Sequence, residues 1–219
     1  MTQRVKVPMT VGEVEGVLAL PAGDAVGPGV VILHEWWGIN EQIQIVAKQW
    51  ADEGFVALVP DLFHGKQAHS ADEAKALMSA LDSQRAVQEI AACVAYLRAH
   101  PRATTRVAVT GYCLGGALAF RTATAVSGLA AVVPFYGVPD GVDWSKVEAP
   151  IQAHFAQHDD WATVARAQEI KAQIPGTMEL HVYDAQHAFC NERRPEVYNA
   201  DAAQQAWGRA VSFVRAHTA

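Results

Sequence analysis

Apolar runs of strand length alternate with amphipathic segments of helix length along most of the chain. Val30–Leu33 is a continuous apolar run rich in β-branched residues, as expected of a strand buried on both faces. In Asp82–Ala99 the apolar positions recur instead at helical spacing along one face. We expect a hairpin at about Val5–Leu20 before this alternation begins. The same pattern predicts further strands at Phe55–Val59, Arg106–Thr110, Leu129–Phe135, Ile151–Phe155 and Glu179–Tyr183, and helices at Glu41–Glu53, Leu114–Ala125, Thr163–Ile174 and Pro195–His217.

Strands that alternate with helices in this way predict βαβ units, and therefore an α/β fold with a mostly parallel sheet and helices on both faces. The most loop-like stretch, Pro21–Gly29, is short and lies between two apolar runs, so we expect one domain over residues 1–219. Tyr136–Pro150 joins two predicted strands and is too short to form a helical cap domain. Functional residues in such sheets follow the carboxyl ends of strands.

The composition narrows the classes of function. The chain has 219 residues and a net charge of −6, and no cluster of lysines and arginines could neutralise phosphates, so we expect no nucleic-acid partner. The apolar runs are too short to span a membrane, and the N-terminal segment lacks the pattern of a signal peptide. Cys93, Cys113 and Cys190 are too few for a disulfide framework, which indicates a reducing compartment. We expect a cytoplasmic monomer.

The segment GYCLGG at residues 111–116 follows a predicted strand and begins a predicted helix. This context is typical of a nucleophile elbow, a sharp turn in which glycines on both sides of the nucleophile leave room where side chains would clash. The N-terminus of the helix would stabilise negative charge on the Cys113 sulfur. Cys113 is therefore the candidate nucleophile. The alternative is a glycine-rich turn that carries a buried, unreactive cysteine.

Candidates for an acid and a histidine follow Cys113 in the order that such a fold requires. His187 comes shortly after the predicted strand Glu179–Tyr183 and would carry the proton. Asp159 comes shortly after Ile151–Phe155 and would orient the His187 ring. Asp160 competes for this role, and we favour Asp159 because it comes earlier after the strand.

The segment HEWWG at residues 34–38 comes directly after the predicted strand Val30–Leu33. In hydrolases built on such sheets, an amide of this loop and the amide after the nucleophile form an oxyanion hole, which nominates the backbone N–H groups of Trp36 and Leu114. Glu35 would lie beside the thiol, where a carboxylate disfavours the thiolate or holds the thiol proton. The alternative is an exposed loop glutamate.

These segments resemble the dienelactone hydrolases. The resemblance rests on GYCLGGALAF at 111–120 and HEWWGIN at 34–40, with further support from VPDLF at 59–63, PFYGV at 134–138 and HAF at 187–189. It covers nearly the whole chain and implies an α/β-hydrolase fold and a carboxylic ester or lactone hydrolase. It also implies a Cys113–His187–Asp159 triad that works through an acyl-enzyme, with Glu35 gating the thiol in the resting state. Such a mechanism requires no metal and no organic cofactor.

The sequence departs from the best-known members of that family where they hold the carboxylate of the substrate. Those members use two arginines, one of them four residues after the catalytic histidine, and here that position is Asn191. Arg193 and Arg194 are close enough to substitute. Because the arginine is absent at Asn191, we expect short neutral esters or lactones to match or exceed a carboxylated dienelactone as substrates. Aromatic residues that follow strand ends are candidates for the pocket wall: Trp36, Trp37, Tyr136, Trp144 and Trp161.

Other functions could use the same residues. A thioesterase would use the same triad, whereas a non-catalytic α/β-hydrolase that binds a small molecule would not need all three of its members. A thiol redox protein would pair Cys113 with Cys190, but the C-x-x-C spacing is absent. Cys190 is also a candidate pocket residue, and Cys93 lies on an apolar helix face and is expected in the core. Four other histidines lack the spacing of metal ligands, so we expect no metal site. They are His64, His69, His154 and His158.

Overall fold

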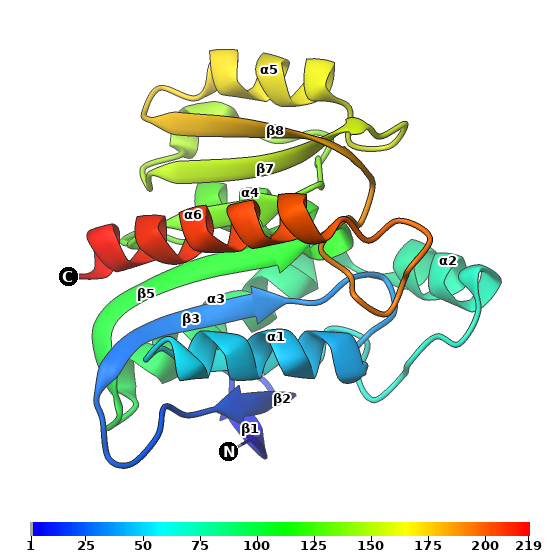
Figure 1. Cartoon of the computed structure of the whole chain (residues 1–219). Helices are drawn as coiled ribbons and strands as arrows, with labels where there is room; N and C mark the ends of the chain where they lie inside the picture. Colours follow the sequence, from blue (N-terminus) through cyan, green and yellow to red (C-terminus); the bar gives the residue numbers. More distant parts are fainter. Residues whose placement is uncertain (1) are drawn as a thin grey trace.

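An eight-stranded sheet forms the centre of the computed structural model, which describes residues 2–219 (Figure 1). The strand order is β1-β2-β4-β3-β5-β6-β7-β8; β2 runs antiparallel to β1 and β4, and the pairs from β4 through β8 are parallel. The expected α/β class is confirmed. The strands are β1 (Thr2–Pro8), β2 (Glu13–Ala19), β3 (Gly27–Leu33), β4 (Val56–Pro60), β5 (Ala103–Tyr112), β6 (Val132–Phe135), β7 (Ile151–His158) and β8 (Met178–Gln186).

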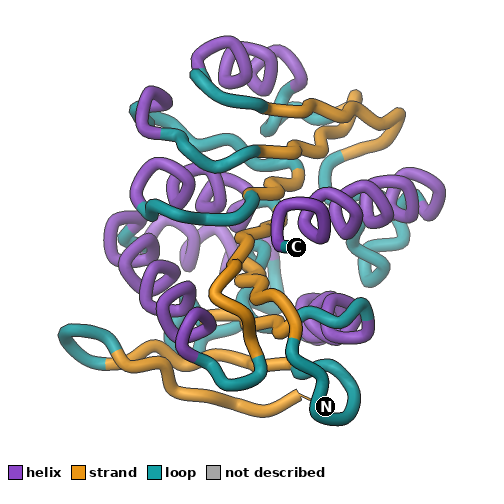
Figure 2. Tube along the Cα trace, turned by 90° about the vertical axis from the view of Figure 1, so that its left-hand side faces the viewer, coloured by secondary structure: helices purple, strands orange, loops and turns teal. Residues whose placement is uncertain are grey.

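Helices cover both faces of the sheet (Figures 1 and 2). On one face α1 and α6 bury Trp50 and Phe213, and on the other face α3, α4 and α5 bury residues that include Cys93 and Leu97. None of the helices in residues 2–219 combines the length and apolarity needed to cross a membrane. The helices are α1 (Glu41–Asp52), α2 (Ala71–Ala80), α3 (Ser83–Ala99), α4 (Leu114–Ala125), α5 (Val164–Gln173) and α6 (Ala200–Thr218), with one 3₁₀ turn, η1 (Trp144–Lys146).

Two helices differ from the expectation. The apolar pattern predicted nothing between the strand that ends near Val59 and the helix at Asp82, yet α2 lies there. Only Ala74 of α2 is buried, so no apolar face marks this helix in the sequence. The last helix begins at Ala200 rather than at Pro195, because the side chain of Asn199 accepts a hydrogen bond from the N–H of Ala202 and caps the helix.

The parallel strands end at one edge of the sheet, where the candidate residues gather. β5 continues through Tyr112, so that Cys113 follows it at once, while Asp159 follows β7 and His187 follows β8. Tyr136 comes directly after β6. Within residues 2–219, the connection from β6 to β7 contains η1 and no cap domain, as expected.

Candidate active site

Cys113 lies in a strained turn between β5 and α4. Its backbone angles are φ 57° and ψ −115°, a conformation that L-residues rarely adopt and that persists only when its surroundings fix it. The N–H of Cys113 donates to the carbonyl oxygen of Phe135 at 3.0 Å, and the Cys113 carbonyl accepts from the N–H of Ala117 at 3.1 Å. The turn has the geometry expected of a nucleophile elbow.

The two glycines around Cys113 permit close approaches of the backbone. A Cβ atom on Gly111 would lie 2.2 Å from the carbonyl oxygen of Gly115, and one on Gly115 would lie 2.2 Å from the carbonyl oxygen of Leu33. Any side chain at these positions would collide with backbone, so only glycine fits. The second contact also brings the start of α4 against the end of β3, where the loop of residues 34–38 begins.

His187 and Asp159 form a direct pair. Nδ1 of His187 and Oδ2 of Asp159 are 2.6 Å apart. The other carboxylate oxygen of Asp159 accepts hydrogen bonds from the backbone N–H groups of Trp161 at 2.8 Å and Ala162 at 3.0 Å. Burial raises the pKa of Asp159, but the bonds to His187 and to the two amides outweigh it and lower that pKa. The neighbour, Asp160, is exposed, so the residue placed against His187 is Asp159.

The His187 ring lies between this carboxylate and the thiol of Cys113. Burial lowers the pKa of His187, but hydrogen bonds to Asp159 and to Cys113 outweigh it and raise this pKa to about 10. Such a ring can hold a proton for a leaving group.

Glu35 is buried, with 7% of its surface exposed, which rules out the exposed loop glutamate. Nδ2 of Asn191 donates to Oε2 of Glu35 at 2.6 Å, and the hydroxyl group of Tyr136 donates to Oε1 at 3.5 Å. Burial raises the pKa of Glu35, opposed in part by Asn191 and by the charge of His187. We did not foresee the role of Asn191 from the sequence. Its position four residues after His187 was the available signal.

The loop that carries Glu35 is fixed by His34, a second residue that sequence reasoning missed. Nε2 of His34 accepts a hydrogen bond from the N–H of Leu62 at 3.3 Å, so Nδ1 carries the proton and donates to the carbonyl oxygen of Glu35 at 2.6 Å. Burial lowers the pKa of His34, which keeps the ring neutral. This arrangement holds the backbone just before Trp36, the proposed oxyanion donor.

A pocket of about 340 Å³ opens over these residues. Cys113, Glu35, Asp159 and His187 all line it. Trp36, Trp37 and Trp161 form an aromatic wall, in which the ring centroid of Trp36 lies 5.2 Å from that of Trp37 and 5.6 Å from that of Trp161. Trp161 is 60% exposed, so this wall is open to solvent.

Two aromatic residues do not take the expected place in the pocket wall. Tyr136 is buried with its ring centroid 5.2 Å from that of His187, and it lines a different cavity. Trp144 packs against Phe120 in the core on the face covered by α4. Both residues follow strand ends, but their side chains leave the backbone in directions that the sequence does not reveal.

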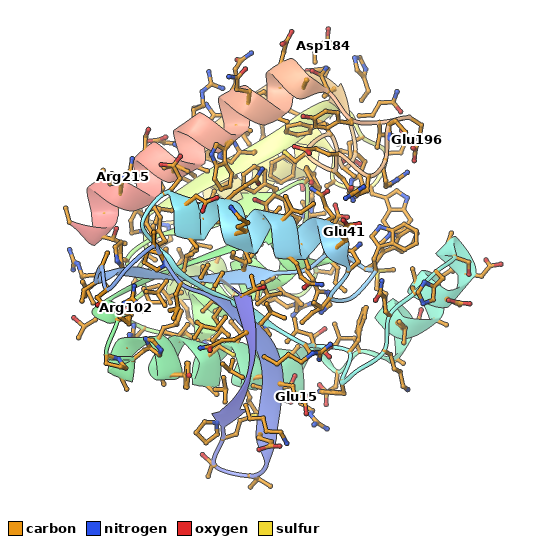
Figure 3. All side chains as sticks on the ribbon, turned by 60° about the horizontal axis from the view of Figure 1, so that its bottom comes forward. Glu15, Glu41, Arg102, Asp184, Glu196 and Arg215 are labelled. Carbon is orange, nitrogen blue, oxygen red and sulfur yellow. The ribbon has the colours of Figure 1, made fainter. Side chains whose placement is uncertain are left out.

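The two candidate anchors for a substrate carboxylate differ in position. Arg193 pairs with Glu41 at 2.5 Å and is not among the residues that line the pocket. Arg194 does line the pocket, and its Nε donates to Glu196 at 2.8 Å. Glu41 and Glu196 lie on the same side of the molecule (Figure 3). Arg194 is therefore the better-placed cation.

The four histidines considered as metal ligands do not come together. His154 contacts the Tyr183 hydroxyl group, His158 pairs with Asp184, and His64 pairs with Glu89. His69 is exposed, and its backbone N–H donates to the carboxylate of Glu73. Among residues 2–219 there is no group of three His, Cys, Asp or Glu side chains that could hold a metal ion.

The fold and the elbow together define an α/β-hydrolase. A dienelactone hydrolase-like promiscuous phosphotriesterase from metagenomic libraries superposes with a TM-score of 0.88 at 20% identity, over 100% of this chain and 99% of that one. A dienelactone hydrolase from Anabaena variabilis superposes with a TM-score of 0.79 at 19% identity, again over 100% and 99% of the two chains. At these identities the similarity establishes the fold.

The sequence comparisons establish the family. The model of the dienelactone hydrolase family matches residues 14–218. The chain is 34% identical to Protein usf of Aquifex pyrophilus over 93% of both chains. It is 32% identical to the carboxymethylenebutenolidase of Pseudomonas sp. strain P51, over 90% of this chain and 88% of that one. The chain belongs to the dienelactone hydrolase family and is a carboxylic ester hydrolase of that type, which confirms the expected enzyme class.

Proposed function

We propose that this hydrolase cleaves small neutral carboxylic esters or lactones through an acyl-enzyme on Cys113. The observation that carries the proposal is the Asp159–His187 pair beside the strained cysteine. The 2.6 Å contact fixes the imidazole, and the pKa of His187, raised to about 10, favours a thiolate–imidazolium pair. A buried, unreactive cysteine would not need these partners.

In the first half of the reaction, Sγ of Cys113 attacks the carbonyl carbon and forms a tetrahedral intermediate. The N–H groups of Trp36 and Leu114 would stabilise its oxyanion, an assignment supported by the contact between Gly115 and the end of β3. The carbon–oxygen bond then breaks, His187 gives its proton to the departing alkoxide, and a thioester remains on Cys113.

In the second half, water attacks the thioester while His187 accepts its proton. The carbon–sulfur bond breaks, the carboxylic acid leaves, and the thiolate–imidazolium pair is restored. Asp159 keeps the ring in one orientation through both halves and stabilises its charged form. Glu35 would gate the thiol, because its carboxyl group lines the same pocket as Cys113.

The pocket supports small, neutral substrates. No cap domain covers it within the described residues 2–219, and Trp161 at its edge is largely exposed, so a long acyl chain would stay in water and lose roughly 0.8 kcal/mol of burial per methylene group. Asn191 is neutral and bonds to Glu35, which leaves Arg194 as the one lysine or arginine among the described residues that line the pocket. All three cysteines are unpaired, which supports a reducing, cytoplasmic location.

Intact-protein mass spectrometry after rapid mixing with p-nitrophenyl acetate tests the acyl-enzyme. We expect one acetyl group per chain on Cys113, and loss of both the adduct and turnover in Cys113→Ala. Cys190→Ala is the matched control and should still acylate at Cys113. An adduct on Cys93 or Cys190, with Cys113→Ala still active, would refute the assignment.

A further inference from the structure

A second cavity, of about 200 Å³, lies on the other side of Glu35 from the Cys113 pocket. Glu35 is a wall of both cavities. Residues of α1 and α6 line the second one, and these two helices lie side by side on the same face of the sheet (Figures 1 and 3). Trp50 of α1 and Trp207 of α6 pack with ring centroids 5.0 Å apart. The proposed hydrolysis gives this cavity no role.

Aromatic side chains form one part of the wall of the second cavity, beside polar residues such as Gln42 and Asn191. The aromatic residues come from two strand ends, from the loop before α6 and from α6 itself: Tyr112, Phe135, Tyr136, Tyr198 and Trp207. Ile43 and Val46 of α1 add an aliphatic side. An apolar cavity of about 150 Å³ is large enough to bind benzene. The size and the walls therefore suit a molecule with a single aromatic ring.

One buried polar atom in this wall has no partner. Gln42 is 7% exposed; its Nε2 donates to the carbonyl oxygen of Cys190 at 3.4 Å, and its Oε1 accepts no hydrogen bond. Buried amide oxygens are normally hydrogen-bonded, and those that are not call for an explanation. A ligand hydroxyl group that donates to Oε1 of Gln42 would supply the missing bond.

The charge of the lining excludes an anionic ligand. Of the residues in 2–219 that line the cavity, none is lysine, arginine or histidine, whereas Glu35 and Glu192 contribute carboxyl groups. Glu192, Ala200 and Gln204 are exposed and mark the side on which a ligand can enter. A carboxylate would find no cation there and would approach two acidic side chains.

We propose that the second cavity is a binding site for a small, neutral, aromatic hydroxyl compound of the phenol class. Its ring occupies the space between Tyr136 and Trp207, and its hydroxyl group donates to Oε1 of Gln42. The site is a separate cavity: within residues 2–219, Glu35 is the one residue that lines both cavities. Binding there does not depend on the acyl-enzyme mechanism.

Ligand-detected NMR titrations of the whole chain with phenol, toluene and benzoate test this proposal. Phenol should bind, and benzoate should bind at least tenfold more weakly. Gln42→Met should weaken the binding of phenol two- to tenfold, which is the range for the loss of one neutral hydrogen bond. The affinity for toluene should stay unchanged, because toluene has no hydrogen-bond donor. An equal response of phenol and toluene to Gln42→Met, or benzoate binding as tightly as phenol, would overturn the proposal.

Three further variants locate the ligand. Ala203 is half-buried on α6 and lines the cavity, so Ala203→Phe should fill the space and abolish phenol binding. Ala216 is exposed on the same helix and does not line the cavity, so Ala216→Phe should leave phenol binding intact. Trp161→Ala, in the wall of the Cys113 pocket, should also leave phenol affinity unchanged; a loss there would place phenol in the catalytic pocket and refute the second site. If Ala203→Phe fails to fold, the Gln42→Met comparison decides.

Discussion

Nδ2 of Asn191 donates a 2.6 Å hydrogen bond to Oε2 of Glu35, so a neutral amide stands where the resemblance to dienelactone hydrolases predicts an arginine. An arginine there would give Glu35 a formal counter-charge and would attract a substrate carboxylate. Asparagine does neither. The buried carboxyl group of Glu35, whose pKa burial raises, therefore has a neutral hydrogen-bond partner at this position.

Asn191→Arg should change the preference for substrate charge. One charge-assisted hydrogen bond is worth about 1.5–3 kcal/mol, so we expect kcat/KM for a carboxylated lactone to rise roughly tenfold or more relative to that for a neutral ester. Both substrates should be measured on one enzyme preparation, with Gln205→Arg on the exposed side of α6 as the control. If the wild type already prefers the carboxylated lactone by orders of magnitude, Arg194 holds its carboxylate, and Arg194→Ala should remove the preference.

Glu35→Gln should make Cys113 easier to alkylate. A nearby carboxylate disfavours the thiolate, so its removal should move the pH profile of iodoacetamide alkylation to lower pH. The profile should be recorded for wild type, Glu35→Gln and Glu192→Gln, since Glu192 is exposed and outside the Cys113 pocket. Superimposable profiles for wild type and Glu35→Gln would remove Glu35 from the mechanism.

His187, Asp159 and Asp160 should contribute unequally to kcat. His187→Ala removes the proton carrier, whereas Asp159→Asn leaves the ring present but poorly held, so His187→Ala should cost more in kcat. Asp160→Asn is the matched control, since Asp160 is exposed and adjacent to Asp159. Steady-state kinetics of the three variants decides. A crippled Asp160→Asn beside an unaffected Asp159→Asn would show that the acid was chosen wrongly.

The sequence was informative where function depends on local chain chemistry. The elbow at Cys113 needs a strand, a sharp turn and a helix in succession, and a one-dimensional pattern contains all three. The order of Cys113, Asp159 and His187 follows in the same way, because each residue comes just after a strand whose apolar run is visible.

The sequence was less informative where packing between distant segments decides which side chains meet. Glu35 and Asn191 are far apart in the chain, and no local pattern predicts that their side chains meet. Tyr136 and Trp144 both follow β6, yet one packs beside His187 and the other in the core on the opposite face. α2 was missed because it buries only Ala74.

Alanine substitutions at two glycines should act in opposite directions. A Cβ atom on Gly115 would lie 2.2 Å from the carbonyl oxygen of Leu33, so Gly115→Ala must displace backbone and should lower stability by about 1–3 kcal/mol or more. Gly208 lies within α6 with nothing within 4 Å, so Gly208→Ala should raise stability by up to about 1 kcal/mol through helix propensity. Urea unfolding measures both. An unchanged stability in Gly115→Ala would contradict the close contact.

The stabilising contribution of His187 should disappear at high pH. Its pKa in the folded protein is raised from 6.5 to about 10, so the folded state binds the His187 proton more tightly than the unfolded chain does. This contribution is complete below about pH 6.5 and is lost as the pH rises towards 10. The Tm of the wild type should therefore exceed that of His187→Gln most at about pH 6, and the difference should shrink through pH 8 and 9. In a domain of this size each kcal/mol lost lowers Tm by roughly 2–4 °C, which scanning calorimetry resolves.

Cys113→Ser distinguishes the effect of Cys113 on the pKa of His187 from the effect of Asp159. The variant keeps the 2.6 Å contact between His187 and Asp159 and removes the thiol, so the pKa of His187 should be raised less. Two Tm differences are compared: that between Cys113→Ser and Cys113→Ser/His187→Gln, and that between wild type and His187→Gln. The first should fall at a lower pH than the second. If the two backgrounds lose the difference over the same pH range, Cys113 does not contribute to the charge on His187, and the thiolate–imidazolium pair is ruled out. If the difference grows as the pH rises, His187 is held neutral by its surroundings, and it would then act first as a base towards the thiol.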